Sequence, residues 1–121
     1  MKTSIYVRTQ FAGIHNWPNA PDEVAFLRNP HRHIFHVKVT IPVTHVDRQY
    51  EFFMVKKRID KYISLLLNFT KNQCGIPILG SMSCERIATE ILSFLRQEYT
   101  EVEGIKVEVN EDMENGAFVE D

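Results

Sequence analysis

Three histidines occupy positions from which their imidazoles could share one metal ion. His31 and His33 form a His-x-His pair at the start of an apolar alternating run, and His15 ends an earlier run of the same kind. Because strand side chains repeat every two residues, a His-x-His pair points both imidazoles to one face of a sheet. A third histidine from a neighbouring strand would complete three nitrogen ligands and leave a fourth position open. That arrangement is typical of a catalytic zinc site, whereas a structural site is closed by four protein ligands.

The phase of the two runs agrees with this interpretation. His15 falls in step with the apolar side chains that precede it, and His31 and His33 fall in step with those that follow them. All three therefore lie at the edge of a surface that we expect to be buried, whereas His36, beside Lys38, falls on the other face. The alternative is a set of ordinary interior or rim histidines, because histidine is a common polar residue as well as the commonest metal ligand. The triplet alone leaves both interpretations open.

Length and composition predict one globular domain spanning residues 1–121. The chain is 44% hydrophobic and 25% charged, and its net charge of −2 lacks the basic surplus that usually accompanies nucleic-acid binding. No segment approaches membrane-spanning length, and the start lacks the apolar stretch of a signal peptide. Two cysteines, Cys74 and Cys84, are too few for a disulfide scaffold. We expect a cytoplasmic protein with no nucleic-acid or membrane partner.

The strands that would position the histidines are indicated by alternating apolar residues. Alternation predicts long strands over 3–14 and 31–43, a short return strand over about 48–52, and a further strand over about 105–109. Asn115-Gly116 is a typical hairpin turn, so we expect a last strand directly after it.

Two helices are predicted between these groups of strands. Helical spacing of apolar residues indicates one helix over about 53–69 and a second beginning near Ser83, which can cap it, with Glu85 favoured in the first turn by the helix dipole. The proline-rich segment 15–30 predicts a loop with one helical turn around 22–27. The order ββααββ, without alternating crossover units, predicts an α+β domain with a four-stranded antiparallel sheet and both helices on one face.

Five short motifs follow one another along the chain in the order of a known family. They are Phe-Ala-Gly-Ile-His at 11–15, His-Arg-His-Ile-Phe-His-Val-Lys-Val at 31–39, Glu-Phe-Phe-Met-Val-Lys at 51–56, Met-Ser-Cys-Glu at 82–85 and Val-Glu-Val-Asn-Glu-Asp at 107–112. With this order of motifs and elements, the chain resembles 6-pyruvoyltetrahydropterin synthase and 6-carboxytetrahydropterin synthase, which have the T-fold (tunnelling fold). The resemblance covers residues 3 to 119.

The resemblance implies a zinc ion and a pterin-like ligand. Zinc on His15, His31 and His33 would act as a Lewis acid toward vicinal oxygens of a substrate side chain. The carboxylate of Glu111 would accept two N–H bonds from the edge of a pterin or guanine ring, with Ser83 or Glu85 helping to seat that ring. Without the resemblance, Glu111 would be interpreted as a solvated turn acid. The resemblance also implies a homo-oligomer, a hexamer or a tetramer, in which neighbouring subunits close the sheet.

The proton-transfer residues of the family are missing. Its base, a cysteine four residues before the first histidine of the pair, corresponds to Leu27, and its Asp-His relay corresponds to Ile63 and Ser64 when residues 62–68 are matched to that motif. Leucine has no proton to exchange, so no environment can make Leu27 a base. Some relatives use a glutamate instead, and Glu23 lies one helical turn before Leu27.

Other residues near these motifs have two interpretations. His36 and Cys84 are further candidates for the base. The thiol of Cys84 could be activated at a helix N-terminus or could simply be a small buried group. Trp17, just after His15, could cover the metal pocket or pack beneath it.

The sequence therefore supports two functions from different classes. One is a zinc-dependent 6-pyruvoyltetrahydropterin or 6-carboxytetrahydropterin synthase-like lyase that acts on a dihydroneopterin triphosphate-like substrate, with Glu23 as the substitute base. The other is a non-catalytic, zinc-containing protein that binds a pterin or purine. An interaction subunit without a ligand is less favoured, because it would not need three histidines in phase.

Overall fold

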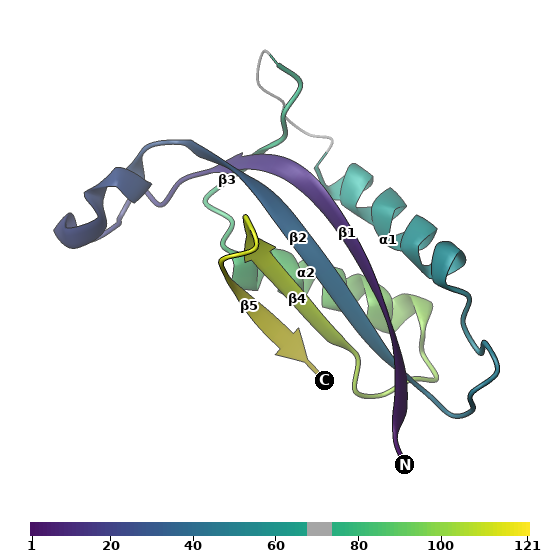
Figure 1. Ribbon diagram of the computed structural model, residues 1–121. Coiled ribbons are helices and arrows are strands. Elements are labelled where there is room, and N and C mark those ends of the chain that lie inside the picture. The colour runs from purple at the N-terminus through teal and green to yellow at the C-terminus, as the bar shows by residue number, and fades with distance from the viewer. Residues whose placement is uncertain (68–73) are drawn as a thin grey trace.

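Two long strands that carry the histidines form the centre of the fold. In the computed structural model, which describes residues 1–67 and 74–121, β1 (Thr3–His15) and β2 (His31–Val43) pair antiparallel along their whole length (Figure 1). The bounds of both strands agree with the predicted ones to within a residue. The histidines lie at the end of the strand pair from which the connecting segment projects.

Three further strands complete a mixed sheet. β4 (Lys106–Glu111) pairs antiparallel with β2, and β5 (Asn115–Glu120) pairs antiparallel with β4. The very short β3 (Ile78–Gly80) pairs in parallel with the end of β1, which gives the order β3-β1-β2-β4-β5. The predicted four-stranded antiparallel sheet and the order ββααββ are therefore corrected to a five-stranded mixed sheet. Three residues that follow a proline and end with a glycine are too few to show an alternating pattern, so the sequence did not reveal β3.

The two predicted helices are present and lie on the same face of the sheet. α1 (Phe52–Leu66) packs on β1, and α2 (Cys84–Glu98) packs on β4 and β5. Residues 68 and 69, the predicted end of the first helix, lie outside the described part of the chain. A 3-10 helix, η1 (Asp22–Arg28), stands in the connection between β1 and β2, where one helical turn was predicted. In Figure 1 this connection extends beyond the body of the sheet.

The predicted return strand over 48–52 is wrong. Arg48 has a left-handed backbone conformation with a φ of 55°, which is incompatible with a regular strand. The side-chain oxygen of Gln49 accepts hydrogen bonds from the backbone N–H and the hydroxyl of Thr44, which closes a loop. The carboxylate of Glu51 then caps α1 by accepting from the backbone N–H groups of its first residues, at 2.8 and 3.2 Å. The chain therefore turns directly into the helix.

The hairpin between β4 and β5 turns three residues earlier than predicted. Its central residues are Asp112 and Met113, both with positive φ (57° and 64°), as in a type I′ turn. The backbone N–H of Glu114 donates to the carbonyl of Glu111 at 2.9 Å and closes this turn. Gly116 instead lies within β5, where a Cβ atom would stand 2.3 Å from the carbonyl oxygen of Val109. The glycine at this position permits a close approach of the two strands rather than a turn.

A single apolar core between the sheet and the helices holds the histidine-bearing strands in place. The side chains of this core that are no more than 2% exposed come from the inner face of the sheet, from the residue before β4 and from both helices: Phe35, Val37, Val39, Ile41, Val55, Ile59, Ile87, Ala88, Ile91, Leu95, Ile105, Val107 and Val109. Burial of such side chains is the main stabilising contribution in a domain of this size. None of the described helices is long and apolar enough to cross a membrane.

Candidate functional site

The strand register brings four potential metal ligands to one point. His15 lies directly opposite His31 on the paired strands, and His33 follows two residues later on the same face. Glu111, the last residue of β4, lies opposite Phe35 of β2 and joins that face. One ligand atom from each of these three histidines and from Glu111 lies within 4.8 Å of the others. We call these four side chains the histidine–glutamate cluster.

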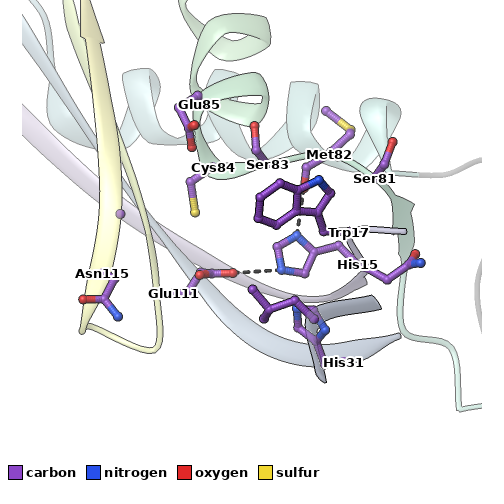
Figure 2. A pocket seen from close by; sticks show the side chains of 13 residues that line it. His15, Trp17, His31, Ser81, Met82, Ser83, Cys84, Glu85, Glu111 and Asn115 are labelled. Atoms are coloured by element: carbon purple, nitrogen blue, oxygen red, sulfur yellow. Dashed lines mark hydrogen bonds and ion pairs between the residues drawn. The ribbon is translucent and has the colours of Figure 1, made fainter. Parts of the chain in front are cut away.

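The carboxylate of Glu111 points into the histidines. Its Oε2 atom lies 2.8 Å from Nε2 of His15 and 3.2 Å from Nε2 of His33. The cluster is largely withdrawn from solvent, since the side chains of His15 and Glu111 are 12% and 27% exposed. Figure 2 shows the imidazole of His15 between the carboxylate of Glu111 and the segment that leads into α2.

Two of the imidazoles are oriented by backbone carbonyl groups outside the cluster. Nδ1 of His15 lies 2.8 Å from the carbonyl oxygen of Met82, just before α2, and Nδ1 of His31 lies 2.8 Å from that of Asn29. A carbonyl oxygen only accepts, so each of these Nδ1 atoms carries the proton and donates it. The Nε2 atoms of both rings are therefore left with lone pairs that can bind a metal. This arrangement of a histidine held by an outer acceptor is typical of metal ligands.

The third imidazole is held by a charged acceptor. Nδ1 of His33 lies 2.6 Å from Oδ2 of Asp112, and the backbone N–H of Ile34 donates to Oδ1 of the same carboxylate at 2.8 Å. These hydrogen bonds, with that of His33 the stronger influence, lower the pKa of Asp112 below its ordinary value. An ionised carboxylate accepts the Nδ1 proton of His33, and Nε2 of this ring is the nitrogen that faces the carboxylate of Glu111 in the cluster.

The contact between His15 and Glu111 indicates that the cluster fits a cation. Nε2 of His15 is buried and makes no hydrogen bond within the described structure, although a carboxylate oxygen lies 2.8 Å away. With Nδ1 protonated, both facing atoms are acceptors, and two acceptors at this distance repel each other unless a proton or a metal ion lies between them. Three imidazole nitrogens and one carboxylate oxygen form a donor set suited to Zn²⁺.

An aromatic side chain supports the cluster from the core. The ring of Phe35, which is fully buried, contacts the imidazoles of His15 and His33 edge to face, with centroid distances of 5.3 and 5.8 Å. Gly13 leaves the space for this ring, because a Cβ atom there would stand 3.1 Å from Phe35 and 2.8 Å from Leu79. The position of the cluster's imidazoles therefore depends on core packing as well as on strand register.

The cluster borders a cavity of about 460 Å³. Its lining comes from the ends of β1 and β2, the segment before α2 and the β4–β5 hairpin: His15, Asn16, Trp17, Leu27, His31, Ser81, Met82, Ser83, Cys84, Glu85, Glu111, Asn115 and Gly116. Such a volume suits a small organic molecule.

Trp17 lies at the border of this cavity and is half exposed. Its backbone is fixed, because its N–H donates to the carbonyl of Leu27 at 2.7 Å and its carbonyl accepts from the N–H of Ala20 at 3.1 Å. These bonds hold the backbone of Trp17 beside the cavity, and Figure 2 shows its indole among the side chains that line it.

Cys84 lines the cavity but is not an activated thiol. It is the first residue of α2 and is buried. Burial, together with the negative charges of Glu111 and Glu85, raises the pKa of the Cys84 thiol to about 12. The structure therefore favours the interpretation of Cys84 as a small buried group over that of a base or nucleophile.

The predicted ligand-binding residues all line the cavity, but they differ in whether their side-chain oxygens are already engaged in hydrogen bonds within the protein. Glu85 and Glu111 both line it with carboxylates. The hydroxyl oxygen of Ser83 caps α2 by accepting from the N–H of Arg86 at 3.1 Å, so its acceptor capacity is partly used. Glu111 was predicted to anchor a ring, whereas its carboxylate here lies among the histidines.

The positions matched to proton transfer do not come together. Leu27 lines the cavity, so an apolar side chain stands where the family's base was expected. Ile63 is buried and Ser64 exposed on α1, and neither is among the residues that line the cavity. Glu23 is exposed on η1 and also lies outside the lining, and His36 belongs to the opposite face of β2.

The residues that orient the imidazoles were missed by the sequence analysis. The carbonyl groups of Met82 and Asn29 give no sequence signal, because every residue carries one. Asp112 did give a signal, since it follows Glu111 directly in the motif at 107–112, but its contact with His33 depends on the position of the β4–β5 turn.

Comparison with known proteins identifies the fold. No family model and no curated protein matches the sequence. A solved structure of 6-pyruvoyl tetrahydropterin synthase from Plasmodium falciparum is 16% identical, with a TM-score of 0.67 over 99% of this chain and 98% of that chain. The same enzyme from Caenorhabditis elegans is 14% identical, with a TM-score of 0.64 over 100% of this chain and 96% of that one. The chain has the fold of the 6-pyruvoyl tetrahydropterin synthases.

Two other solved structures are similar to this chain over its whole length. An uncharacterized protein from Wolinella succinogenes is 14% identical, with a TM-score of 0.67 over 100% of this chain and 99% of that chain. The other is a Plasmodium vivax synthase in which a glutamate described as a catalytic residue is replaced by alanine; it is 14% identical, with a TM-score of 0.68 over 100% and 98% of the two chains. At these identities the likeness is one of fold, and the chemistry has to be argued from the site.

Proposed function

We propose that this chain is a zinc-dependent protein of the synthase fold that binds a pterin-type or guanine-like ring and acts as a lyase on a dihydroneopterin triphosphate-like substrate, with altered proton transfer. The observation that carries the proposal is the histidine–glutamate cluster at the border of a cavity. His15, His31 and His33 would hold the zinc. When bound, the zinc would supply a Lewis acid for oxygens of the substrate side chain.

The chain's own residues would bind and orient the ligand. Glu111 would turn its carboxylate toward the ring edge once a metal and a ligand occupy the site, since one carboxylate can accept two parallel N–H bonds. Glu85 and Ser83 would contact the ring at the N-terminus of α2. Trp17 beside the cavity would limit the access of water to the bound ligand.

The proton acceptor would be a carboxylate that lies outside the cavity lining. Glu23 remains the predicted base and would have to reach the cavity from the exposed side of η1. The glutamate described as catalytic in the Plasmodium vivax synthase is consistent with a carboxylate in this role. The second candidate function, a non-catalytic zinc protein that binds a pterin or purine, is favoured by one observation: Leu27 lines the cavity where a base is expected.

Metal analysis tests the zinc site, on which the proposed function depends. We expect about one zinc per chain in purified protein and its loss in His31→Ala, because removing one of three imidazoles weakens the site strongly. His36→Ala is the matched control, since His36 lies on the other face of the same strand and should leave the zinc content unchanged. Equal zinc in a triple alanine variant of the three ligand histidines would contradict the proposal.

Turnover assays distinguish the two candidate functions. We expect weak or no conversion of dihydroneopterin triphosphate, because general base catalysis typically contributes about 10²–10⁴-fold. Calorimetry should still detect binding of a dihydropterin by the wild type and weaker binding by Glu111→Gln, with the zinc content of both proteins measured in parallel because Glu111 belongs to the histidine–glutamate cluster. Leu27→Glu places a carboxylate in the cavity, and a gain in turnover would favour the enzyme, whereas binding without turnover in both proteins would favour the binding protein. Loss of residual turnover in Glu23→Gln would identify Glu23 as the base.

A further inference from the structure

Asp112 connects the β4–β5 turn to the strand that carries two of the metal ligands. Its Oδ2 atom lies 2.6 Å from Nδ1 of His33, and its Oδ1 atom accepts the backbone N–H of Ile34 at 2.8 Å. Its own backbone N–H donates to the carbonyl oxygen of Ile34 at 2.8 Å. Both carboxylate oxygens and the backbone of one residue are thus engaged by two consecutive residues of β2.

The conformation of the turn allows these contacts. Asp112 has a φ of 57°, a left-handed conformation that aspartate and asparagine adopt more readily than most other side chains. The side-chain oxygen of Asn110 accepts the backbone N–H of Met113 at 2.9 Å and holds the other half of the turn. The turn therefore has two side-chain anchors, and only Asp112 touches a histidine of the cluster.

The acceptor of His33 differs from those of the other two ligands. His15 and His31 donate to neutral backbone carbonyl groups, whereas His33 donates to a carboxylate. A charged acceptor makes the shorter and stronger hydrogen bond and increases the basicity of the opposite ring nitrogen. It also fixes the tautomer, because a carboxylate can only accept.

We propose that Asp112 is a positioning residue that holds the Nδ1 proton of His33 and thereby makes His33 the strongest of the three metal ligands. The inference rests on the proposed function in that it takes the cluster to be a metal site. It assigns to the β4–β5 turn a role in setting metal affinity, which a turn that merely joined two strands would not have.

The substitution Asp112→Asn is the sharpest test. Asparagine has the same shape and tolerates the same backbone conformation, so the turn should persist. Its amide has only one oxygen. If this oxygen accepts from Ile34, the NH₂ group faces Nδ1 of His33 and favours the tautomer with the proton on Nε2, which cannot bind a metal. If the amide is reversed, the bond to Ile34 is lost and two donors face each other.

Zinc affinity, measured by competition with a chromophoric chelator, should fall about 10–100-fold in Asp112→Asn, as expected for loss of an outer partner of a metal-bound histidine. Asn110→Ala is the matched control, because it removes the other anchor of the same turn without touching His33. Its zinc affinity should stay within about threefold of the wild type, the reproducibility needed to separate the two variants. The inference is overturned if Asp112→Asn also stays within that range, or if both variants lose the same affinity.

Nitrogen NMR of the metal-free protein gives a readout that does not depend on the proposed function. His33 should carry its proton on Nδ1 in the wild type and in Asn110→Ala, and should shift toward Nε2 or toward a mixture in Asp112→Asn. An unchanged tautomer in Asp112→Asn contradicts the positioning role when the backbone N–H of Ile34 keeps its wild-type hydrogen-bonded chemical shift, because the amide oxygen then still faces Ile34 and cannot accept from His33. If the wild type binds no zinc, the proposed function and the effect on affinity both fail, while the tautomer still decides whether Asp112 orients His33.

Discussion

In each imidazole of the cluster, the two ring nitrogens have different roles. Nδ1 of each donates to an oxygen outside the cluster, and Nε2 of His15 and of His33 faces the carboxylate of Glu111. This division removes the tautomeric freedom that an ordinary rim histidine would retain. The buried Nε2 of His15 beside the carboxylate of Glu111 is the residue-scale feature that calls for a positive charge between the two atoms, either a shared proton or a metal ion.

The two cysteines should differ strongly in reactivity. With the pKa of Cys84 raised to about 12 by burial and by nearby carboxylates, roughly one molecule in 10⁴ carries this thiolate at pH 8. We expect a thiol-specific reagent to modify the exposed Cys74 first and Cys84 only on unfolding, as read by mass spectrometry of digested protein. Because the raised pKa disfavours the thiolate in the folded state, this group stabilises the fold below pH 9 and ceases to do so as the pH rises toward 12. Rapid labelling of Cys84 at pH 8 would restore it as a candidate base.

At the scale of elements, the residues of the site lie at the ends of strands rather than along their middle parts. β1 ends at His15, β2 begins at His31, and β4 ends at Glu111, so all three contribute ligands at one end of the sheet. α2 begins beside the same end, where Ser83 caps it and the carbonyl before it holds His15. The apolar core then fixes these ends relative to one another.

The substitution Phe35→Leu tests this coupling between core and site. The ring of Phe35 stacks on Phe11 at 5.4 Å and contacts two ligand imidazoles, so its loss should lower the free energy of unfolding by about 1–3 kcal/mol, less than the 3–5 kcal/mol typical of Phe→Ala. Zinc affinity should fall as well, because His15 and His33 lose their common support.

Phe118→Leu is the matched control, since that ring is 56% exposed on the other face of the sheet. We expect it to change the free energy of unfolding by less than about 0.5 kcal/mol. Urea denaturation of the metal-free proteins measures the free energy of unfolding of both variants. A stable Phe35→Leu variant with unchanged zinc affinity would show that strand register alone positions the ligands.

At the scale of the whole molecule, the sheet has two edges that no other described strand covers. β1 meets β3 only at its last two residues, and β5 forms the opposite edge. Unpaired strand edges bind further strands and are otherwise a cause of aggregation. Tyr6 and Phe118 add exposed aromatic surface on the face away from the helices.

We expect these edges to pair with strands of neighbouring subunits in a homo-oligomer, for which the family resemblance of the sequence implies a hexamer or a tetramer. Sedimentation or light scattering over a series of micromolar concentrations measures its size. A monomer throughout that range would contradict the expectation. The measurement should be repeated after zinc removal with a chelator, because β1 and β5 take part through their edges and not through the metal ligands, so the assembly should persist.

Several elements of the fold were predictable because their signal is local. The bounds of β1 and β2, the presence of both helices and the shared face of the three histidines follow from side-chain periodicity. The return strand at 48–52 was predicted wrongly because the prediction used the local alternation of side chains alone. This alternation does not reveal that Gln49 closes a loop and that Glu51 caps a helix. The hairpin turn was misplaced because Asn-Gly is a strong local signal, whereas close packing in β5 requires that glycine.

The sequence by itself determined which residues could act as ligands and which face they share, because the two-residue repeat of a strand is a property of the backbone. Only the tertiary structure decided how they act. The contacts that orient His15 and His33 join residues 67 and 79 positions apart, and the carboxylate of Glu111 enters the cluster from a third strand. No periodicity encodes such separations. They are set by strand register, helix caps and core packing together, and these determine which atom of each imidazole is left available for a metal.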